Sequence, residues 1–216
     1  DLHSVTHSFP TRRSSDLLSR QGLGSIATLV LNVAAGAYGD AAIAGMSIVT
    51  RISFFTYAVV IGLGQGFQPL CGFCYGARLY ARVKEAFYYC IKCGTIFLAI
   101  CAVIGFIFSE PIIELFRDDA KVIEVGSMAL KWQVISFPLV ATIVLTNMLM
   151  QTIRKPIRAN IVAGARSGLF FIPLIFILPH FFGLLGVEMC QAWADFCSFA
   201  VAIPIAWSAF RDMKKV

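Results

Sequence analysis

Residues 41–69 read AAIAGMSIVTRISFFTYAVVIGLGQGFQP and contain a single charged side chain, Arg51. A helix that crosses the hydrocarbon core of a bilayer needs about 20 mostly apolar residues, and this run is longer than that. A strand is a poor interpretation, because the run is too long and its apolar residues do not alternate with polar ones. The stretch therefore predicts a transmembrane helix.

Five further apolar runs surround this one, and we interpret each as a membrane span. They cover residues 23–38, 87–108, 132–150, 168–182 and 184–207. Of the 216 residues, 58% are hydrophobic and 14% are charged, whereas soluble domains have about 45–50% and about 25%. This composition excludes a disordered chain and a nucleic-acid-binding domain, and it argues against a water-soluble enzyme. The predicted fold class is an all-α membrane protein, a bundle of six transmembrane helices within residues 18–216.

Lysine and arginine are distributed unevenly when the connectors between these runs are assigned to alternate sides of the membrane. One side receives Arg20, Arg78, Arg82, Lys84, Arg154, Lys155, Arg158, Arg211, Lys214 and Lys215, whereas the other receives Arg117 and Lys121. Cytoplasmic loops carry the excess of positive charge in membrane proteins. We therefore predict a multi-pass protein of the plasma (inner) membrane, with both ends of residues 18–216 in the cytoplasm and the acidic connector 109–124 outside.

Residues 1–17, DLHSVTHSFPTRRSSDL, differ sharply in composition from the rest of the chain. They are polar and balanced in charge, and they lack the apolar run of a signal peptide. Within this stretch, the codons of residues 7–17 can match the end of a common sequencing-library adapter. We therefore interpret residues 1–17 as an artefactual, disordered tail that makes no packed contacts, the alternative being a natural soluble linker. On this interpretation the natural N-terminal part of the protein is missing.

Charged residues inside the apolar runs are the first candidates for a functional site. Arg51 and Asp195 lie too deep in their runs to reach water easily, and such residues usually face a bundle interior or a wet cavity. We predict that Asp195 faces the interior, with Arg51, Lys131 or Arg166 as its partner. Such a pair could only fix helix packing, or the charged residues could line a transport path.

Uncharged hydrogen-bonding side chains recur within the first, second and fourth runs. They include Asn32, Gln65, Gln68, Asn147 and Gln151. Together with Arg51, Lys131 and Asp195, these residues are the candidates for a substrate-binding cavity. The alternative is hydrogen bonding between helices, and Gln65 and Gln68 could instead satisfy backbone groups freed near Pro69.

Two cysteine pairs, Cys71–Cys74 and Cys90–Cys93, have the spacing of a zinc site. The second pair lies at the mouth of a predicted span, and we interpret the cysteines as small hydrophobic residues, so no metal site is predicted. Motifs of nucleotide-binding loops, serine hydrolases and zinc proteases are absent. We therefore predict no enzymatic activity, and any transport would use an ion gradient or passive flow.

Several short motifs resemble, in their order and spacing, the second six-helix lobe of the multidrug and toxic compound extrusion (MATE) family. They are RQGLG (20–24), AAGAYGD (34–40), RISFF (51–55), GLGQGFQP (62–69), GFCYGA (72–77), LFRDD (115–119) and FFIP (170–173). Members of this family are twelve-helix secondary antiporters that expel lipophilic, often cationic drugs or toxins in exchange for sodium ions or protons. The resemblance implies a bacterial exporter, with this chain as one lobe and a missing N-terminal lobe of the same chain as its partner.

The resemblance also bears on ion coupling. Some family members carry a cation-binding acid on the first helix of this lobe and another on its fourth. The first position corresponds to Asn32 here, and the run 132–150 contains no acid. We therefore expect the coupling ion, Na⁺ or H⁺, to bind in the missing lobe, and no other cofactor. The cleft facing that lobe is expected to be formed by the first two spans, with Asn32, Gln65 and Gln68.

Two alternatives come from other functional classes. A lipid-linked saccharide flippase of the same superfamily would use Arg51, Lys92, Lys131 and Arg166 to bind a pyrophosphate headgroup, since these cations outnumber the acids Glu188 and Asp195. A six-helix scaffold that does not transport is the other alternative. The sequence of a second lobe would separate them, because an acid in its first helix favours antiport and clusters of lysine and arginine favour a flippase.

Overall fold

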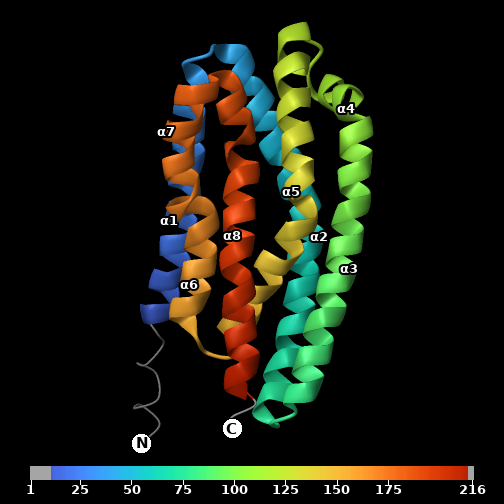
Figure 1. Cartoon of the computed structure of the whole chain (residues 1–216), viewed down its shortest axis with the longest axis vertical. Helices are drawn as coiled ribbons and strands as arrows, with labels where there is room; N and C mark the ends of the chain where they lie inside the picture. Colours follow the sequence, from blue (N-terminus) through green and yellow to red (C-terminus); the bar gives the residue numbers. More distant parts are fainter. Residues whose placement is uncertain (1–10, 214–216) are drawn as a thin grey trace, which may run out of the picture.

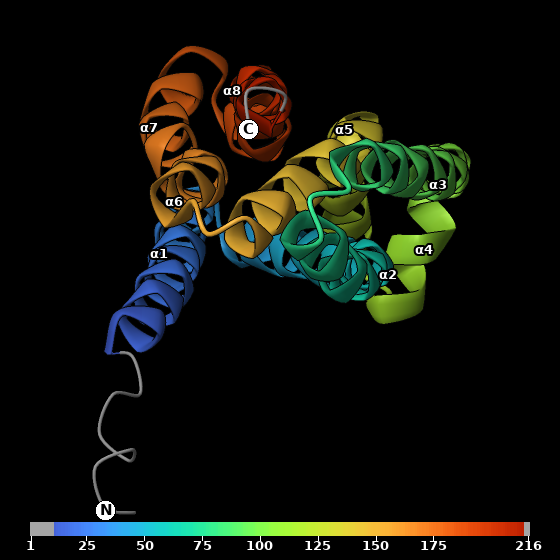
Figure 2. The same ribbon diagram turned by 90° about the horizontal axis from the view of Figure 1, so that it is seen from below.

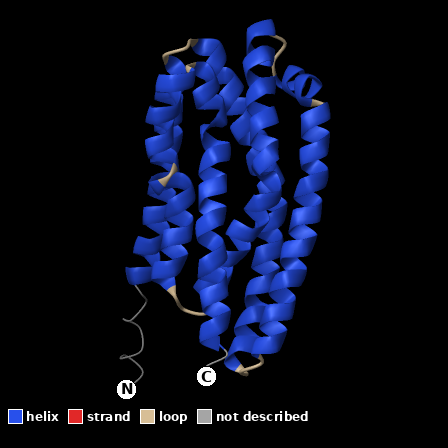
Figure 3. Cartoon of the chain, in the orientation of Figure 1, coloured by secondary structure: helices blue, strands red, loops and turns tan. Residues whose placement is uncertain are grey.

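The computed structural model describes the backbone of residues 11–213, with side chains from residue 22 onward except Leu23. The elements are α1 (Thr11–Gly36), α2 (Asp40–Gly76), α3 (Tyr80–Ile107), α4 (Ser109–Phe116), α5 (Ala120–Thr152), α6 (Pro156–Gly164), the π-helix η1 (Ala165–Leu169), α7 (Phe171–Phe182) and α8 (Leu184–Met213). Figure 3 shows helices and short turns throughout this described region, which contains no strand. The predicted all-α class is confirmed.

Five helical segments among the described residues are long and apolar enough to cross a bilayer. They are Asp40–Gly76, Tyr80–Ile107, Ala120–Thr152, Pro156–Phe182 and Leu184–Met213. Among the residues whose side chains are described, α1 contributes a shorter apolar stretch, Gly24–Gly36. Five of the six predicted spans thus meet the length required of a membrane helix, and the first, of which residues 24–36 are described as an apolar helix, stays a prediction.

Helix α1 begins at Thr11, inside the stretch that we interpret as a tail. Residues 1–10 lie outside the described part of the chain, as do the side chains of residues 11–17. The prediction that the tail makes no packed contacts therefore falls on residues whose side chains are not described. Its artefactual origin stays a prediction.

The helices stand side by side in an elongated bundle (Figure 1). Seen from one end, α5 crosses the middle of the bundle, with α6, α7 and α8 on one side and α2, α3 and α4 on the other (Figure 2). Helix α5 packs against α2, α3 and α8, and fully buried side chains such as Phe137, Leu145 and Leu149 lie along it. The core is therefore organised around α5.

One predicted connector and one predicted span differ in extent from the structure. Residues 109–124 contain the short helix α4 and the first turn of α5, with Ile113 of α4 fully buried. The fifth span begins at Pro156 rather than at residue 168, because proline at the first helical position starts a helix well. Polar composition indicated a connector at 109–124, and the start of the apolar run set the beginning of the fifth span, but helix ends can be polar as well.

Close backbone contact between α2 and α5 depends on two glycines. A Cβ atom added at Gly45 would lie 3.1 Å from the backbone nitrogen of Gly126. Small residues at such crossings let membrane helices approach closely, which increases their van der Waals contact. The crossing fixes α2 against the central helix and thereby positions Tyr57, further along α2, beside α5.

Candidate functional site

A buried carboxylate, Asp195 of α8, lies at the centre of a polar cluster inside the bundle. Its side chain is fully buried, and Arg166 Nε donates to Oδ1 at 2.7 Å. Gln191 Nε2 donates to the same oxygen at 3.3 Å. Ser136 Oγ and Gln133 Nε2 lie within hydrogen-bond distance of Oδ2, at 2.9 and 3.3 Å. The carboxylate is therefore paired and hydrogen-bonded on both oxygens, as a buried charge requires.

Arg166 is presented by η1, the wide π-helical turn between α6 and α7. Its guanidinium carbon lies 4.6 Å from the centre of the Tyr57 ring on α2, which is a cation–π contact. The Tyr57 hydroxyl accepts a hydrogen bond of 2.9 Å from Gln133 Nε2. Single π turns of this kind occur frequently at functional sites. The turn thus brings a cation from the α6–α7 segment into contact with two other helices.

These side chains connect four parts of the bundle. We call them the Asp195 cluster, defined as Tyr57, Gln133, Ser136, Arg166, Gln191 and Asp195. The Arg166 side chain is 22% exposed, whereas that of Asp195 is fully buried, so the pair can be approached from the arginine side only. Removing one member of a buried ion pair lowers the free energy of unfolding by more than the intact pair adds to it. The arrangement is suited to locking α2, α5, η1 and α8 together.

The prediction that Asp195 faces the interior is confirmed, and Arg166 is its partner. Lys131 instead lies 3.6 Å from Glu110 of α4, in a partly exposed pair. Arg51 is exposed on α2, on the side opposite its buried residues, and forms no ion pair within the part of the chain that the structure describes. An Arg51–Asp195 or Lys131–Asp195 pair is therefore ruled out.

The uncharged candidates do not converge on one site. Asn32 of α1 and Gln65 of α2 are exposed, and Gln68 is half-buried. Gln151 Nε2 donates to Asn147 Oδ1 at 2.9 Å, which joins two residues one turn apart on α5. The eight predicted residues thus divide into exposed or half-buried positions on α1 and α2, paired residues of α5, and the buried Asp195.

Four members of the Asp195 cluster were missed by the sequence analysis. They are Tyr57, Gln133, Ser136 and Gln191. A signal was present, because Gln133 and Ser136 are three residues apart and Gln191 and Asp195 are four apart, spacings that place each pair on one helix face. Tyr57 gave no such signal, since tyrosine in an apolar run is usually interpreted as a lipid or core residue.

The cysteine pairs show no metal-binding arrangement among the described residues. Cys71, Cys74 and Cys90 are buried, Cys93 is half-buried, and all four are free thiols. A structural zinc site needs four ligands at about 2.0–2.3 Å from one point. Across the side chains that the structure describes, no three His, Cys, Asp or Glu residues are grouped to hold a metal ion.

Comparisons with known proteins place these features in context. The sequence profile of the MatE family matches residues 21–177. The multidrug export protein MepA of Staphylococcus haemolyticus is 26% identical over 213 residues, covering 95% of this chain and 47% of that protein. MepA of Staphylococcus saprophyticus is 29% identical over 182 residues, covering 84% of this chain and 40% of that protein. The chain spans about half the length of these curated relatives.

Solved transporter structures have the same fold. The MATE transporter VcmN of Vibrio cholerae, in its bent form, superposes with a TM-score of 0.86 at 18% identity, covering 92% of this chain and 45% of that one. An outward-facing multidrug resistance MATE family transporter gives a TM-score of 0.85 at 19% identity, covering 99% of this chain and 50% of that one. A Pyrococcus furiosus transporter described as having a binding pocket of reverse polarity gives a TM-score of 0.86 at 19% identity. The match covers 91% of this chain and 45% of that one. At these identities the likeness establishes the fold, a bundle corresponding to about half of each transporter.

Proposed function

We propose, from the premise that this chain belongs to the MATE family, that it forms one lobe of a secondary-active drug exporter. The family assignment makes it a non-enzymatic, multi-pass membrane protein related to multidrug export proteins. The proposal is that a second six-helix lobe completes the transporter in a bacterial plasma membrane. The complete protein would expel lipophilic, often cationic compounds in exchange for sodium ions or protons.

The single observation that carries this proposal is the exposed face of α1 and α2. Arg51 lies in the middle of an apolar helix, yet its side chain is exposed and forms no ion pair with any described residue. Placing such a charge in hydrocarbon is costly, so an intramembrane arginine usually faces a water-filled cavity. Asn32 and Gln65 are exposed on the same two helices. A hydrated cleft against a second lobe would accommodate all three side chains.

In this mechanism the Asp195 cluster would hold the helices of the lobe together. Alternating access arises when one bundle rocks against another as a nearly rigid body. A buried ion pair with hydrogen bonds to α2, α5 and α8 opposes relative movement of these helices. Because Asp195 is fully buried, we assign it to holding the lobe together rather than to contacting substrate. The coupling ion would bind in the second lobe, since Asn32 is neutral.

A lipid-linked saccharide flippase is the second candidate, and Arg51 is the observation that favours it. An exposed arginine would bind a pyrophosphate more readily than a cationic drug. The Pyrococcus furiosus transporter, described as having a binding pocket of reverse polarity, is a precedent for such a departure within this fold. However, Lys131 is paired with Glu110 and Arg166 with Asp195, which leaves fewer cations for an anionic headgroup. The balance of charge therefore favours the drug exporter.

Substitutions on the exposed face test the drug-exporter proposal. In this chain joined to a matching first lobe, Gln65→Ala and Asn32→Ala are expected to change resistance to individual compounds by about two- to tenfold, the range for losing one uncharged hydrogen bond. The measurement is the minimum inhibitory concentration of a panel of cationic and zwitterionic drugs. Lys121→Ala at the start of α5, an exposed position away from this face, is the control and should leave the profile unchanged. Unchanged profiles for both variants at normal membrane abundance would refute the lining role.

A further inference from the structure

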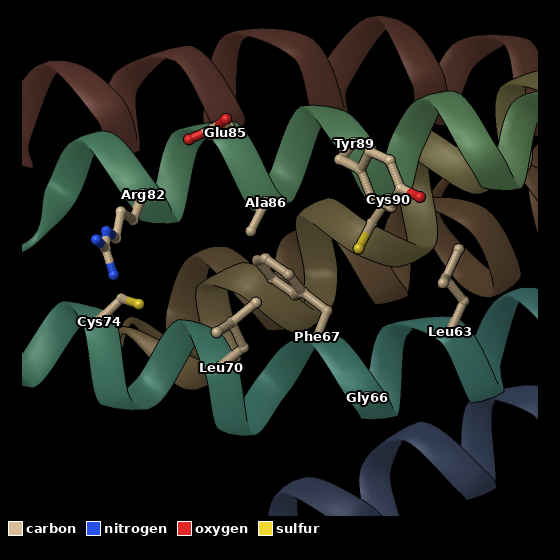
Figure 4. A pocket seen from close by; sticks show the side chains of 10 residues that line it. All are labelled: Leu63, Gly66, Phe67, Leu70, Cys74, Arg82, Glu85, Ala86, Tyr89 and Cys90. Carbon is tan, nitrogen blue, oxygen red and sulfur yellow. The ribbon is translucent and has the colours of Figure 1, made fainter.

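A groove between α2 and α3 lies outside both the Asp195 cluster and the exposed α1–α2 face. It has a volume of about 720 Å³ and lies near the turn at residues 77–79 that joins the two helices. Figure 4 shows Arg82, Ala86 and Cys90 of α3 pointing toward α2 across it, whereas Glu85 and Tyr89 lie along the outer edge of α3. The turn carries Arg78, one of the cations of the predicted cytoplasmic side, so the groove lies near the predicted cytoplasmic surface.

The inner part of the groove is apolar. Leu63, Phe67 and Leu70 of α2 face Ala86 of α3 across it. Gly66 leaves additional space, because a Cβ atom built there would have no neighbour within 4 Å. The protein's own side chains therefore do not fill the groove, and an apolar chain lying along it would bury these surfaces.

The outer part of the groove carries one positive and one negative charge. Arg82 and Glu85 are exposed on α3, three residues apart, and neither forms an ion pair with another described residue. In Figure 4 the Arg82 guanidinium extends from α3 toward Cys74 of α2. The groove thus combines an apolar interior with a guanidinium and a carboxylate at its opening.

Tyrosines mark the level of this opening relative to the membrane. The rings of Tyr75 and Tyr80 lie 5.7 Å apart beside the turn that joins α2 and α3. Tyrosine is enriched where hydrocarbon meets headgroups. Arg82 and Glu85 therefore lie at headgroup level, while Leu63 and Phe67 lie at the depth of the acyl chains.

We propose that this groove binds one phospholipid with a phosphoethanolamine headgroup. The lipid phosphate would accept charge-assisted hydrogen bonds from Arg82, and its ammonium group would donate to Glu85. One acyl chain would lie along Leu63, Phe67 and Leu70. Basic pockets between membrane helices are known to bind lipid headgroups. The carboxylate adds selectivity, because a phosphoglycerol headgroup has no cation to pair with Glu85 and a choline group has no N–H to donate.

Native mass spectrometry of the full chain in detergent tests the proposal. The probes are palmitoyl-oleoyl phosphatidylethanolamine and the phosphatidylglycerol and phosphatidylcholine with the same acyl chains. The ethanolamine lipid is expected to bind at a concentration roughly tenfold lower than either of the other lipids. Arg82→Ala should weaken its binding roughly tenfold, and Glu85→Gln should abolish the preference over phosphatidylglycerol. Lys121→Ala, which removes an exposed cation at the start of α5 outside the groove, should leave binding unchanged.

Two glycine variants test the position of the acyl chain. Gly66→Leu fills the groove and is expected to abolish binding of all three lipids. Gly62→Leu is the matched control, because a Cβ atom at Gly62 also meets open space but that residue does not line the groove. Circular dichroism establishes that each variant keeps its helical content. Equal affinity for all three lipids, or unchanged binding in the Arg82→Ala or Gly66→Leu variant, would overturn the proposal.

Discussion

Replacing Asp195 with asparagine is expected to destabilise the bundle by about 3–5 kcal/mol, the range for breaking a buried ion pair from one side. The substitution keeps the shape of the side chain but removes its charge. Arg166, whose Nε donates to Asp195 at 2.7 Å, would then be left without its partner in the interior. The measurement is unfolding of the purified chain in detergent, followed by circular dichroism.

Two further variants separate the effect of the pair from that of any charge change on α8. Asp212→Asn makes the same substitution on the same helix, but Asp212 pairs with Lys155 and Arg158 in a partly exposed position. Such pairs contribute about 0–1 kcal/mol, so a small effect is expected. Combining Asp195→Leu with Arg166→Met removes both buried charges and should recover much of the lost stability. Equal losses for Asp195→Asn and Asp212→Asn would contradict the locking role.

Adding a single methyl group at Gly186 is expected to be nearly as damaging. A Cβ atom there would lie 2.4 Å from the backbone carbonyl carbon and oxygen of Leu178 and 2.6 Å from the Pro179 nitrogen. Because these are backbone atoms, the tight connection between α7 and α8 would have to shift. Overpacking typically costs about 1–3 kcal/mol, and we expect Gly186→Ala to reach the upper end of that range.

A second glycine-to-alanine change provides the control for this steric prediction. Gly164 ends α6, and a Cβ atom built there meets nothing within 4 Å. Gly164→Ala is therefore expected to be neutral or to stabilise the chain by up to about 1 kcal/mol, the difference in helix propensity. Melting temperatures of the two variants in the same detergent make the comparison. A Gly186→Ala variant as stable as Gly164→Ala would show that the connection adapts without cost.

The fold class and family could be predicted from the sequence because their signals are local. Hydropathy over residues 41–69 requires a long apolar helix, and motifs such as 62–69 keep their order along the chain. The MatE profile match to residues 21–177 confirms the predicted family resemblance. The helical connector at 109–124 was missed, because a short helix such as α4 is held by packing at Ile113 rather than by its composition.

The candidate site could be predicted only in part. Burial of Asp195 followed from the cost of placing a carboxylate in hydrocarbon. Its partner did not follow, because three cations at different positions along the chain could each have reached it. Arg166 reaches Asp195 from a π turn, and hydropathy carries no signal for such a turn. The contact of Tyr57 with Gln133 and Arg166 likewise depends on how α2, α5 and η1 pack.

If this chain is one of two lobes that rock against each other, transport requires the second lobe. Each described span satisfies its own backbone hydrogen bonds, so the chain alone should insert in the membrane. It would lack the opposite wall of the cleft, however, and the exposed Arg51 and Gln65 would have no lobe to face. Alternating access around a site between two bundles is then impossible.

Ethidium efflux from bacterial cells tests this claim most directly. Cells expressing the chain alone, at a membrane abundance established by immunoblot, are expected to expel no more ethidium than cells with an empty vector. Co-expression of a matching first MATE lobe is expected to restore efflux that depends on the ion gradient. Gradient-driven efflux by the chain alone, abolished by Asp195→Asn, would contradict the account and identify the chain as a self-sufficient half-transporter.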